Sequence, residues 1–276
     1  RSQFVKDVTA GIIVAIIALP LSIALALASG VGPQAGIFTA IVAGFVISAF
    51  GGSNVQIAGP TAAFATIVAG IVAKDGLDGL VISTILVGIF LILMGLCHFG
   101  SLIKFIPYTI TTGFTSGIAV TIVIGQLKDF FGVTYPNGLK PIETMEKLNA
   151  FALGFSSFHV DALIVGGVSL AILIISPYIF KRIPGSLIAV VIGILMVKFL
   201  PLHVSTIGNL YTITNDLPSF HIPAAKFSMV KSAIPNAFTI AVLAAIESLL
   251  SCVVADGMIN GKHRSDTELV AQGLGN

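Results

Sequence analysis

One carboxylate stands alone in a long apolar stretch of this sequence. Glu247 lies in AFTIAVLAAIESLLSCVVA and is the only ionisable residue near the centre of any apolar run. An acid at such a depth in a membrane is costly unless it faces protein or water, so it predicts a functional site. The alternative is a structural acid bonded to a neighbouring helix. Ser251 lies one helical turn further on, where its hydroxyl would share a face with the carboxylate.

A second feature is a break inside another apolar run. Residues 53–64 read SNVQIAGPTAAF. Residues 55–58 are short and partly β-branched, which predicts a strand-like segment. Gly59-Pro60 ends that segment, and proline is favoured at the first position of a helix. Residues 61–73 then predict a helix that is only about half as long as a membrane-spanning one.

The start of this half-helix predicts an anion site. Unpaired N–H groups and the positive end of the helix dipole attract an anion. Thr61, Ala62 and Ala63 would offer backbone N–H groups, and the Thr61 hydroxyl would add a donor. Ser22 follows Pro20, which interrupts the first apolar run, and we expect Ser22 to line the same cavity. A simple kink at Pro20 is the alternative.

The composition indicates the solvent in which these residues lie. Of 276 residues, 56% are hydrophobic and 9% are charged, and the mean hydropathy is +1.05. A soluble domain typically carries about 25% charged residues. The long uncharged runs predict about eight membrane spans, at residues 8–29, 35–50, 55–73, 79–97, 106–127, 162–180, 186–200 and 233–255. The sequence therefore predicts an all-α polytopic membrane protein.

Several classes of protein are disfavoured by what the sequence lacks. The five histidines form no ligand pair at helical spacing, and Cys97 and Cys252 lie in apolar runs, so we expect no metal centre or disulfide. HExxH, GxSxG and P-loop motifs are absent, which argues against an enzyme and a bound cofactor. The net charge is +2 and the basic residues are dispersed, which argues against nucleic-acid binding.

The basic residues also predict an orientation. They divide equally between the two sides of the membrane, but the segments on the side of the N-terminus are shorter, and Lys181-Arg182 lies on the shortest. Short basic loops favour the cytoplasm, so we expect a cytoplasmic N-terminus in a cell membrane. The connections at residues 128–160 and 201–232 are long and moderately polar.

Four stretches of the chain together resemble a known family. They are DVTAGIIVAIIALPLSIALALASGVGPQAGIFTAIVAGFVISAFGG, the break GPTAAF, IPYTITTGFTSGIAV, and IESLLSCVVADGM followed by KHRSDTELVAQGLGN. In this order, from Asp7 to Asn276, they resemble the SulP (sulfate permease) family of anion transporters. The resemblance implies two intertwined seven-helix inverted repeats, a 7+7 fold in which core helices 1–4 and 8–11 move against gate helices 5–7 and 12–14.

The resemblance also implies a division of this chain. Residues 1–100 would form core helices 1–4, with the third helix broken, and residues 101–232 would form gate helices 5–7 with long extracellular loops. Residues 233–276 would form core helix 8 and the start of helix 9. The tenth helix, expected across the anion from the third, and the STAS domain common in the family would then lie beyond Asn276. We therefore expect a piece of a longer protein, which would form a homodimer.

Differences from the family pattern bear on the substrate and the coupling ion. Family members commonly have Gln directly after the first-helix proline, and Leu21 here favours bicarbonate over sulfate. The ESLLS motif resembles the bicarbonate-transporting branch, in which an aspartate and a threonine hold sodium. Glu247 and Ser251 occupy those positions. Members with glutamate there are associated with proton coupling. The resemblance therefore leaves two candidates for the coupling ion, Na⁺ and H⁺.

The predicted function is secondary active transport of a small inorganic oxyanion, bicarbonate or sulfate. It would be coupled to Na⁺ or H⁺ through an elevator-like alternating-access movement in the lipid bilayer. A nucleobase permease of the same fold is one alternative, although the third-helix break offers few polar groups for a flat ring. An anion channel or a non-transporting subunit is another alternative, and neither would need the carboxylate of Glu247.

Overall fold

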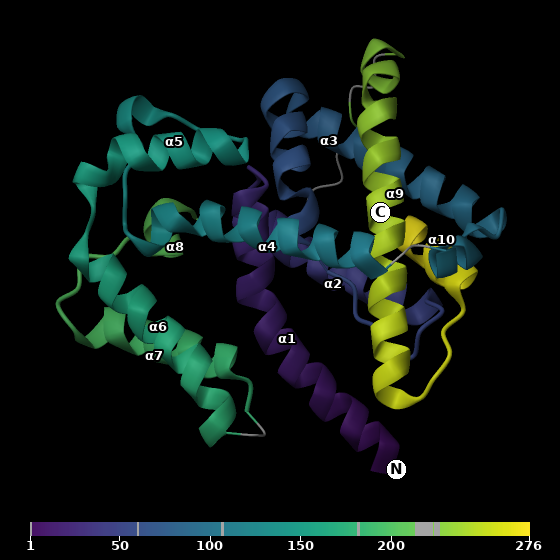
Figure 1. Ribbon diagram of the computed structural model, residues 1–276, viewed down its shortest axis with the longest axis horizontal. Helices are drawn as coiled ribbons and strands as arrows, with labels where there is room; N and C mark the ends of the chain where they lie inside the picture. Colours follow the sequence, from purple (N-terminus) through teal and green to yellow (C-terminus); the bar gives the residue numbers. More distant parts are fainter. Residues whose placement is uncertain (1, 60, 106–107, 181–182, 213–222, 224–226) are drawn as a thin grey trace. The chain divides into compact units, whose positions relative to one another are not determined.

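The protein is built of helices and connecting loops. A computed structural model describes residues 2–59, 61–105, 108–180, 183–212, 223 and 227–276, and these residues form no strand (Figure 1). The α-helices are α1 (Ser2–Ala28), α2 (Pro33–Phe50), α3 (Ala65–Leu96), α4 (Tyr108–Phe130), α5 (Thr144–Gly154), α6 (Val160–Ile179), α7 (Gly185–Phe199), α8 (Ile207–Leu210), α9 (Phe227–Ile259) and α10 (Ser265–Gly275). Short 3₁₀ helices are η1 (Ala62–Phe64), η2 (Phe99–Phe105), η3 (Pro136–Gly138) and η4 (Phe155–Ser157).

Several of these helices are suited to a bilayer. In the described part of the chain, five are long and apolar enough to cross a membrane, namely α1, α2, η1 with α3, α6 and α9, and α7 is a shorter apolar helix. Large apolar side chains on them point outward: Phe45 is 73% exposed and Val254 is 64% exposed. Broad exposed apolar surfaces of this kind are typical of contact with lipid.

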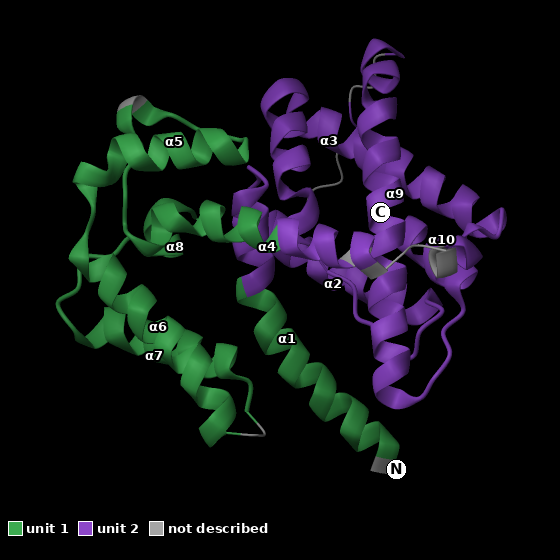
Figure 2. Ribbon diagram, viewed as in Figure 1, with its two compact units in different colours: residues 1–20, 118–213 green, residues 21–117, 214–276 purple. Residues whose placement is uncertain are grey.

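The chain divides into two compact units (Figure 2). Unit 1 comprises residues 1–20 and 118–213, and unit 2 comprises residues 21–117 and 214–276. Helices α1 and α4 each contribute to both units. The division into core and gate helices stays a prediction.

Unit 1 contains a helix inside a connection that the sequence predicted as a loop. Helix α5 forms within residues 128–160 because Glu143 and Glu146 make a reciprocal capping box at its start. A row of aromatic rings packs within this connection, with the centroids of neighbouring rings 5.3–6.2 Å apart. The rings belong to Phe130, Phe131, Phe151, Phe155 and Phe158.

Unit 2 has its core where α3, α9 and α10 meet. The buried residues of this core are Ile71, Val87, Leu91, Ala237, Ile240, Ala241, Ala245, Leu249 and Leu269. Phe90 and Phe238 pack edge to face with centroids 5.7 Å apart. Helices α3 and α10 touch through glycines, since a Cβ on Gly273 would lie 2.6 Å from the carbonyl oxygen of Gly88. Small residues therefore let these backbones approach closely, as is common between membrane helices.

The third and fourth predicted spans are joined in one element. Helix α3 runs from Ala65 to Leu96, and a single residue inside it, Gly76, leaves the helical conformation with φ 70° and ψ −165°. The sequence predicted two spans, at residues 55–73 and 79–97, because charged residues interrupt the apolar pattern between them. In the structure a single non-helical residue, Gly76, makes this short connection.

Candidate functional site

The predicted break before the third helix is present, with a tighter first turn than expected. Thr61 has an extended backbone (φ −122°, ψ 146°), and its Oγ1 accepts a hydrogen bond from the N–H of Ala63 at 3.3 Å. The chain then forms η1 before α3 begins at Ala65. Ala62 and Ala63 are half-buried in this 3₁₀ turn. Pro60 lies outside the described residues.

The segment before the break, residues 51–59, is irregular. The strand predicted at residues 55–58 does not form, because no strand partner lies beside it in the described part of the chain. Side chains of α9 and α10 hold the segment instead. Isolated extended segments need such partners, because every backbone N–H and C=O that leaves water must be paired.

The structure brings Thr61 together with Glu247. The Thr61 hydroxyl donates a hydrogen bond of 2.6 Å to Oε1 of Glu247 on α9, across 186 residues of sequence. This length lies within the ordinary range for a hydrogen bond between a hydroxyl and a carboxyl oxygen. The start of the broken helix and the lone acid of the eighth predicted span are therefore direct neighbours.

The second oxygen of Glu247 is unsatisfied. Oε2 is buried and has no hydrogen-bond partner among the described residues. Buried polar atoms without partners are rare in folded proteins, and they often mark a place where a water molecule or an ion binds. A proton or a small cation on this oxygen would satisfy it, so the carboxylate can act as a binding group.

Two other predicted site residues lie elsewhere in the structure. Ser251 is one turn beyond Glu247 on α9, but its side chain is exposed. Ser22 is 1% exposed and lies at the crossing of α1 and α2, where a Cβ on Gly36 would come within 2.2 Å of the Ser22 carbonyl oxygen. The roles given to Ser22 and Ser251 stay predictions.

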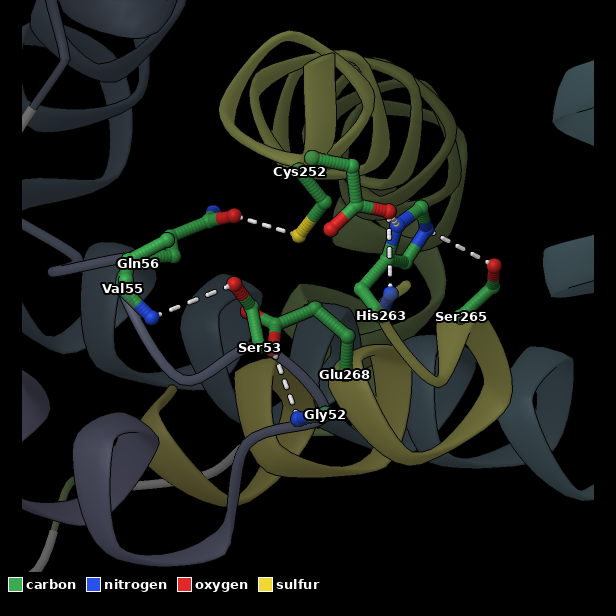
Figure 3. A network of polar contacts seen from close by, with 9 residues as sticks. Gly52, Ser53, Val55, Gln56, Cys252, His263, Ser265 and Glu268 are labelled. Carbon is green, nitrogen blue, oxygen red and sulfur yellow. Dashed lines mark hydrogen bonds and ion pairs between the residues drawn. The ribbon is translucent and has the colours of Figure 1, made fainter. Parts of the chain in front are cut away.

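A buried polar network next to this site was missed by the sequence reasoning (Figure 3). The amide of Gln56 donates to Oγ of Ser248 at 3.1 Å, and the thiol of Cys252 is directed at the carbonyl oxygen of Gln56. Ser248 also makes a long contact of 3.5 Å with Oε1 of Glu268. The two contacts of Gln56 join the segment before the break to α9, and the contact between Ser248 and Glu268 joins α9 to α10.

Glu268 is a second acid in the apolar interior. It is 1% exposed, its Oε2 accepts from the N–H of Gly52 at 2.8 Å, and its Oε1 accepts from the Gln272 side chain at 3.2 Å. The signal that could have found it is its place in TELVAQGLG, where it is followed by small and apolar residues. A buried carboxyl group is costly unless hydrogen-bond donors face it, and Gly52 and Gln272 supply those donors to Glu268.

The loop between α9 and α10 is fixed by histidine contacts. Nδ1 of His263 lies 2.7 Å from Oδ2 of Asp256, and its Nε2 lies 2.9 Å from Oγ of Ser265. At the start of α10, Asp266 accepts from the N–H of Gly100 at 3.0 Å and meets Nδ1 of His98 at 2.9 Å. These contacts hold the N-terminal end of α10, which carries Glu268.

Comparison with known proteins identifies the family. Residues 4–276 match the family described as Sulfate permease family. The chain belongs to the sulfate permease family. The resemblance that the sequence motifs indicated is thereby confirmed.

The permease relatives include transporters named for two anions. A putative sulfate transporter of Bacillus subtilis, YvdB, is 40% identical, and the match covers 99% of this chain and 52% of that protein. The bicarbonate transporter BicA of a Picosynechococcus species is 32% identical, with coverage of 98% and 49%. This permease chain therefore spans about half the length of the curated relatives it matches.

Solved structures agree with the predicted permease fold. The transmembrane domain of a cyanobacterial bicarbonate transporter, BicA, matches with a TM-score of 0.82 at 30% identity, covering 96% of this chain and 68% of that one. SLC26A9 matches with a TM-score of 0.81 at 18% identity, covering 99% and 47%, and this likeness shows the fold alone. The all-α polytopic fold of a 7+7 inverted-repeat transporter is confirmed.

Proposed function

We propose that this permease chain carries part of the binding site of a secondary active transporter for a small inorganic oxyanion. The observation that carries the proposal is the hydrogen bond between Thr61 and Glu247, together with the buried Oε2, which has no partner among the residues that the structure describes. It places the start of a broken helix, which favours an anion, next to an acid that can bind a cation or a proton.

The two groups complement each other electrostatically. An anion held at residues 61–63 would be repelled by the ionised carboxylate of Glu247 close by, because charges interact strongly where water is scarce. A proton or Na⁺ on Oε2 removes that repulsion. Anion binding and binding of the coupling ion therefore favour each other, and this reciprocity is what coupling requires.

The substrate is proposed from the relatives. Bicarbonate and sulfate are both small oxyanions, and relatives named for each cover nearly the whole of this chain. Leu21 after the first-helix proline favours bicarbonate. The coupling ion is Na⁺ or H⁺, held by Glu247, with Ser251 one helical turn along α9 as a further ligand.

The setting of the transporter follows from the same proposal. The protein would lie in the cell membrane with its N-terminus in the cytoplasm and work as a homodimer. Core helices would move against gate helices in an elevator-like step that carries the loaded site across the bilayer. No covalent chemistry is needed.

Uptake by the purified full-length protein in proteoliposomes tests the proposal. Labelled sulfate or bicarbonate should accumulate above its equilibrium level under an inward Na⁺ gradient or an inward H⁺ gradient, and should not accumulate in protein-free vesicles. Failure to move either oxyanion under both gradients would contradict the proposal. Saturable uptake of uracil or xanthine instead would identify a nucleobase permease.

A further inference from the structure

We infer that Ser248 and Glu268 are positioning residues, which hold the segment at residues 51–59 so that Thr61 meets Glu247. The inference rests on the proposed transport function and names residues that control its site without touching the substrate. Figure 3 shows two of the contacts that carry it, from Gly52 to Glu268 and from Cys252 to Gln56.

The segment needs support from outside itself. Residues 51–59 have neither helical nor strand structure, so their backbone is not held by a regular pattern of hydrogen bonds. A segment without such a pattern keeps one conformation only where other elements bind it. Three contacts along it and just after it, at Gly52, Gln56 and Thr61, supply that binding.

The first contact clamps Gly52 to the start of α10. Its N–H donates to Glu268 at 2.8 Å, and its carbonyl oxygen accepts from the N–H of Arg264 at 2.9 Å. A Cβ on Gly52 would lie 2.0 Å from the Arg264 carbonyl oxygen, so only glycine allows this approach. Because Glu268 is almost fully buried, its hydrogen bond to Gly52 is shielded from competing water.

The second contact holds both ends of the Gln56 amide. Its nitrogen donates to Ser248 at 3.1 Å, and its oxygen faces the thiol of Cys252, one turn further along α9. Ser248 in turn contacts Glu268, so this hydroxyl links the two contacts into one network. Its sequence neighbour Glu247 makes the third contact, with Thr61.

The contacts of Gly52, Gln56 and Thr61 all act on one short, continuous segment. Gly52, Gln56 and Thr61 are four or five residues apart, so loosening the first two leaves Thr61 tethered at one side only. The fraction of molecules in which Thr61 meets Glu247 then falls. Since apparent affinity scales with the fraction of molecules competent to bind, the half-saturating concentrations of anion and coupling ion should both rise.

Transport kinetics of full-length variants in proteoliposomes test this inference. We expect Ser248→Ala and Glu268→Ala to raise the KM for sulfate or bicarbonate, and the half-saturating concentration of the coupling ion, by at least roughly fivefold, because each variant loses a hydrogen bond that holds the segment. The maximal rate per folded protein should change little. Glu268→Gln keeps an acceptor for the N–H of Gly52 and should restore both constants to within about twofold of wild type.

A matched control separates positioning from general destabilisation. Ser83 is buried like Ser248, but its hydroxyl bonds the carbonyl oxygen of Gly79 inside α3 and does not touch the segment. Ser83→Ala should leave both constants unchanged. The inference is overturned if Glu268→Ala and Ser248→Ala lower only the maximal rate. It is also overturned if Glu268→Gln is as impaired as Glu268→Ala, because the charge itself would then bind the coupling ion.

Alkylation of Cys252 gives a readout that needs no transport. The thiol is fully buried against Gln56, so a membrane-permeant maleimide should modify it slowly in wild type, as measured by mass spectrometry of the peptide. Ser248→Ala and Glu268→Ala should speed modification at least about fivefold, whereas Ser83→Ala and Glu268→Gln should not. If wild type moves no oxyanion, the proposed function fails while this rate still decides the positioning role. Equal rates of Cys252 alkylation in all variants would reject the positioning role of Ser248 and Glu268.

Discussion

The hydroxyl of Thr61 donates a 2.6 Å hydrogen bond to Oε1 of Glu247, while Oε2 of the same carboxylate is buried without a partner in the described part of the chain. The hydroxyl thus fixes one oxygen and leaves the other available. This hydrogen bond ties the first turn after the break to α9, so changes at either residue should affect both the anion and the coupling ion.

Removing the Thr61 hydroxyl should weaken anion binding. Thr61→Val keeps the shape of the side chain but loses the donor to Glu247 and the acceptor for the N–H of Ala63. The hydrogen bond to Glu247 holds the first turn after the break against α9 and contributes about 1.5–3 kcal/mol, so the half-saturating anion concentration should rise about tenfold or more. Thr61→Ser keeps the hydroxyl and should show a clearly smaller rise. Equal effects of both variants in uptake assays would contradict this role.

Bulky residues in the 3₁₀ turn should block the anion. Ala62 and Ala63 are half-buried beside Thr61, and a phenyl ring at either position would fill the space in front of the helix start. Ala62→Phe and Ala63→Phe should abolish saturable anion uptake. Ala73→Phe, on an exposed face of α3, is the matched control and should transport like wild type. Normal uptake by both blocking variants would make the break a structural feature only.

The kink in α3 should depend on glycine. Gly76 has φ 70° and ψ −165°, a conformation that is essentially restricted to glycine. Gly76→Ala should destabilise the protein by about 1–3 kcal/mol and lower its thermal unfolding midpoint in detergent. Gly70→Ala lies in a helical part of α3 with open space around its Cβ, and it should be neutral or slightly stabilising. An unchanged midpoint for Gly76→Ala would contradict the kink.

Two residues of the candidate site were predictable because each is marked by its own neighbours in the sequence. Glu247 stood out because an isolated acid in an apolar run is costly and is seldom kept without a function. Thr61 stood out because Gly59-Pro60 marks a helix start. Their contact was not predictable from spacing, because it joins positions 186 residues apart and depends on how α9 packs against α3.

The parts that the sequence reasoning missed depend on tertiary contacts. Gln56 and Ser248 are individually ordinary polar residues, and only their pairing across 192 residues makes them part of a network. The charged residues near Gly76 divide two predicted spans, and only tertiary structure shows that a single non-helical residue joins them. The strand predicted at residues 55–58 was wrong because β-branched residues fit any extended backbone, paired or not.

The most direct test of the coupling role of Glu247 compares exchange with accumulation in the Glu247→Gln variant of the full-length protein. The amide keeps an acceptor for Thr61 but can neither release a proton nor hold a cation as a carboxylate does. We predict that the variant still exchanges labelled oxyanion across the vesicle membrane, which shows that it is folded, but no longer accumulates it under an Na⁺ or H⁺ gradient that drives the wild type. Gradient-driven accumulation by Glu247→Gln at the wild-type rate would contradict the coupling role, because the carboxylate would then be structural only.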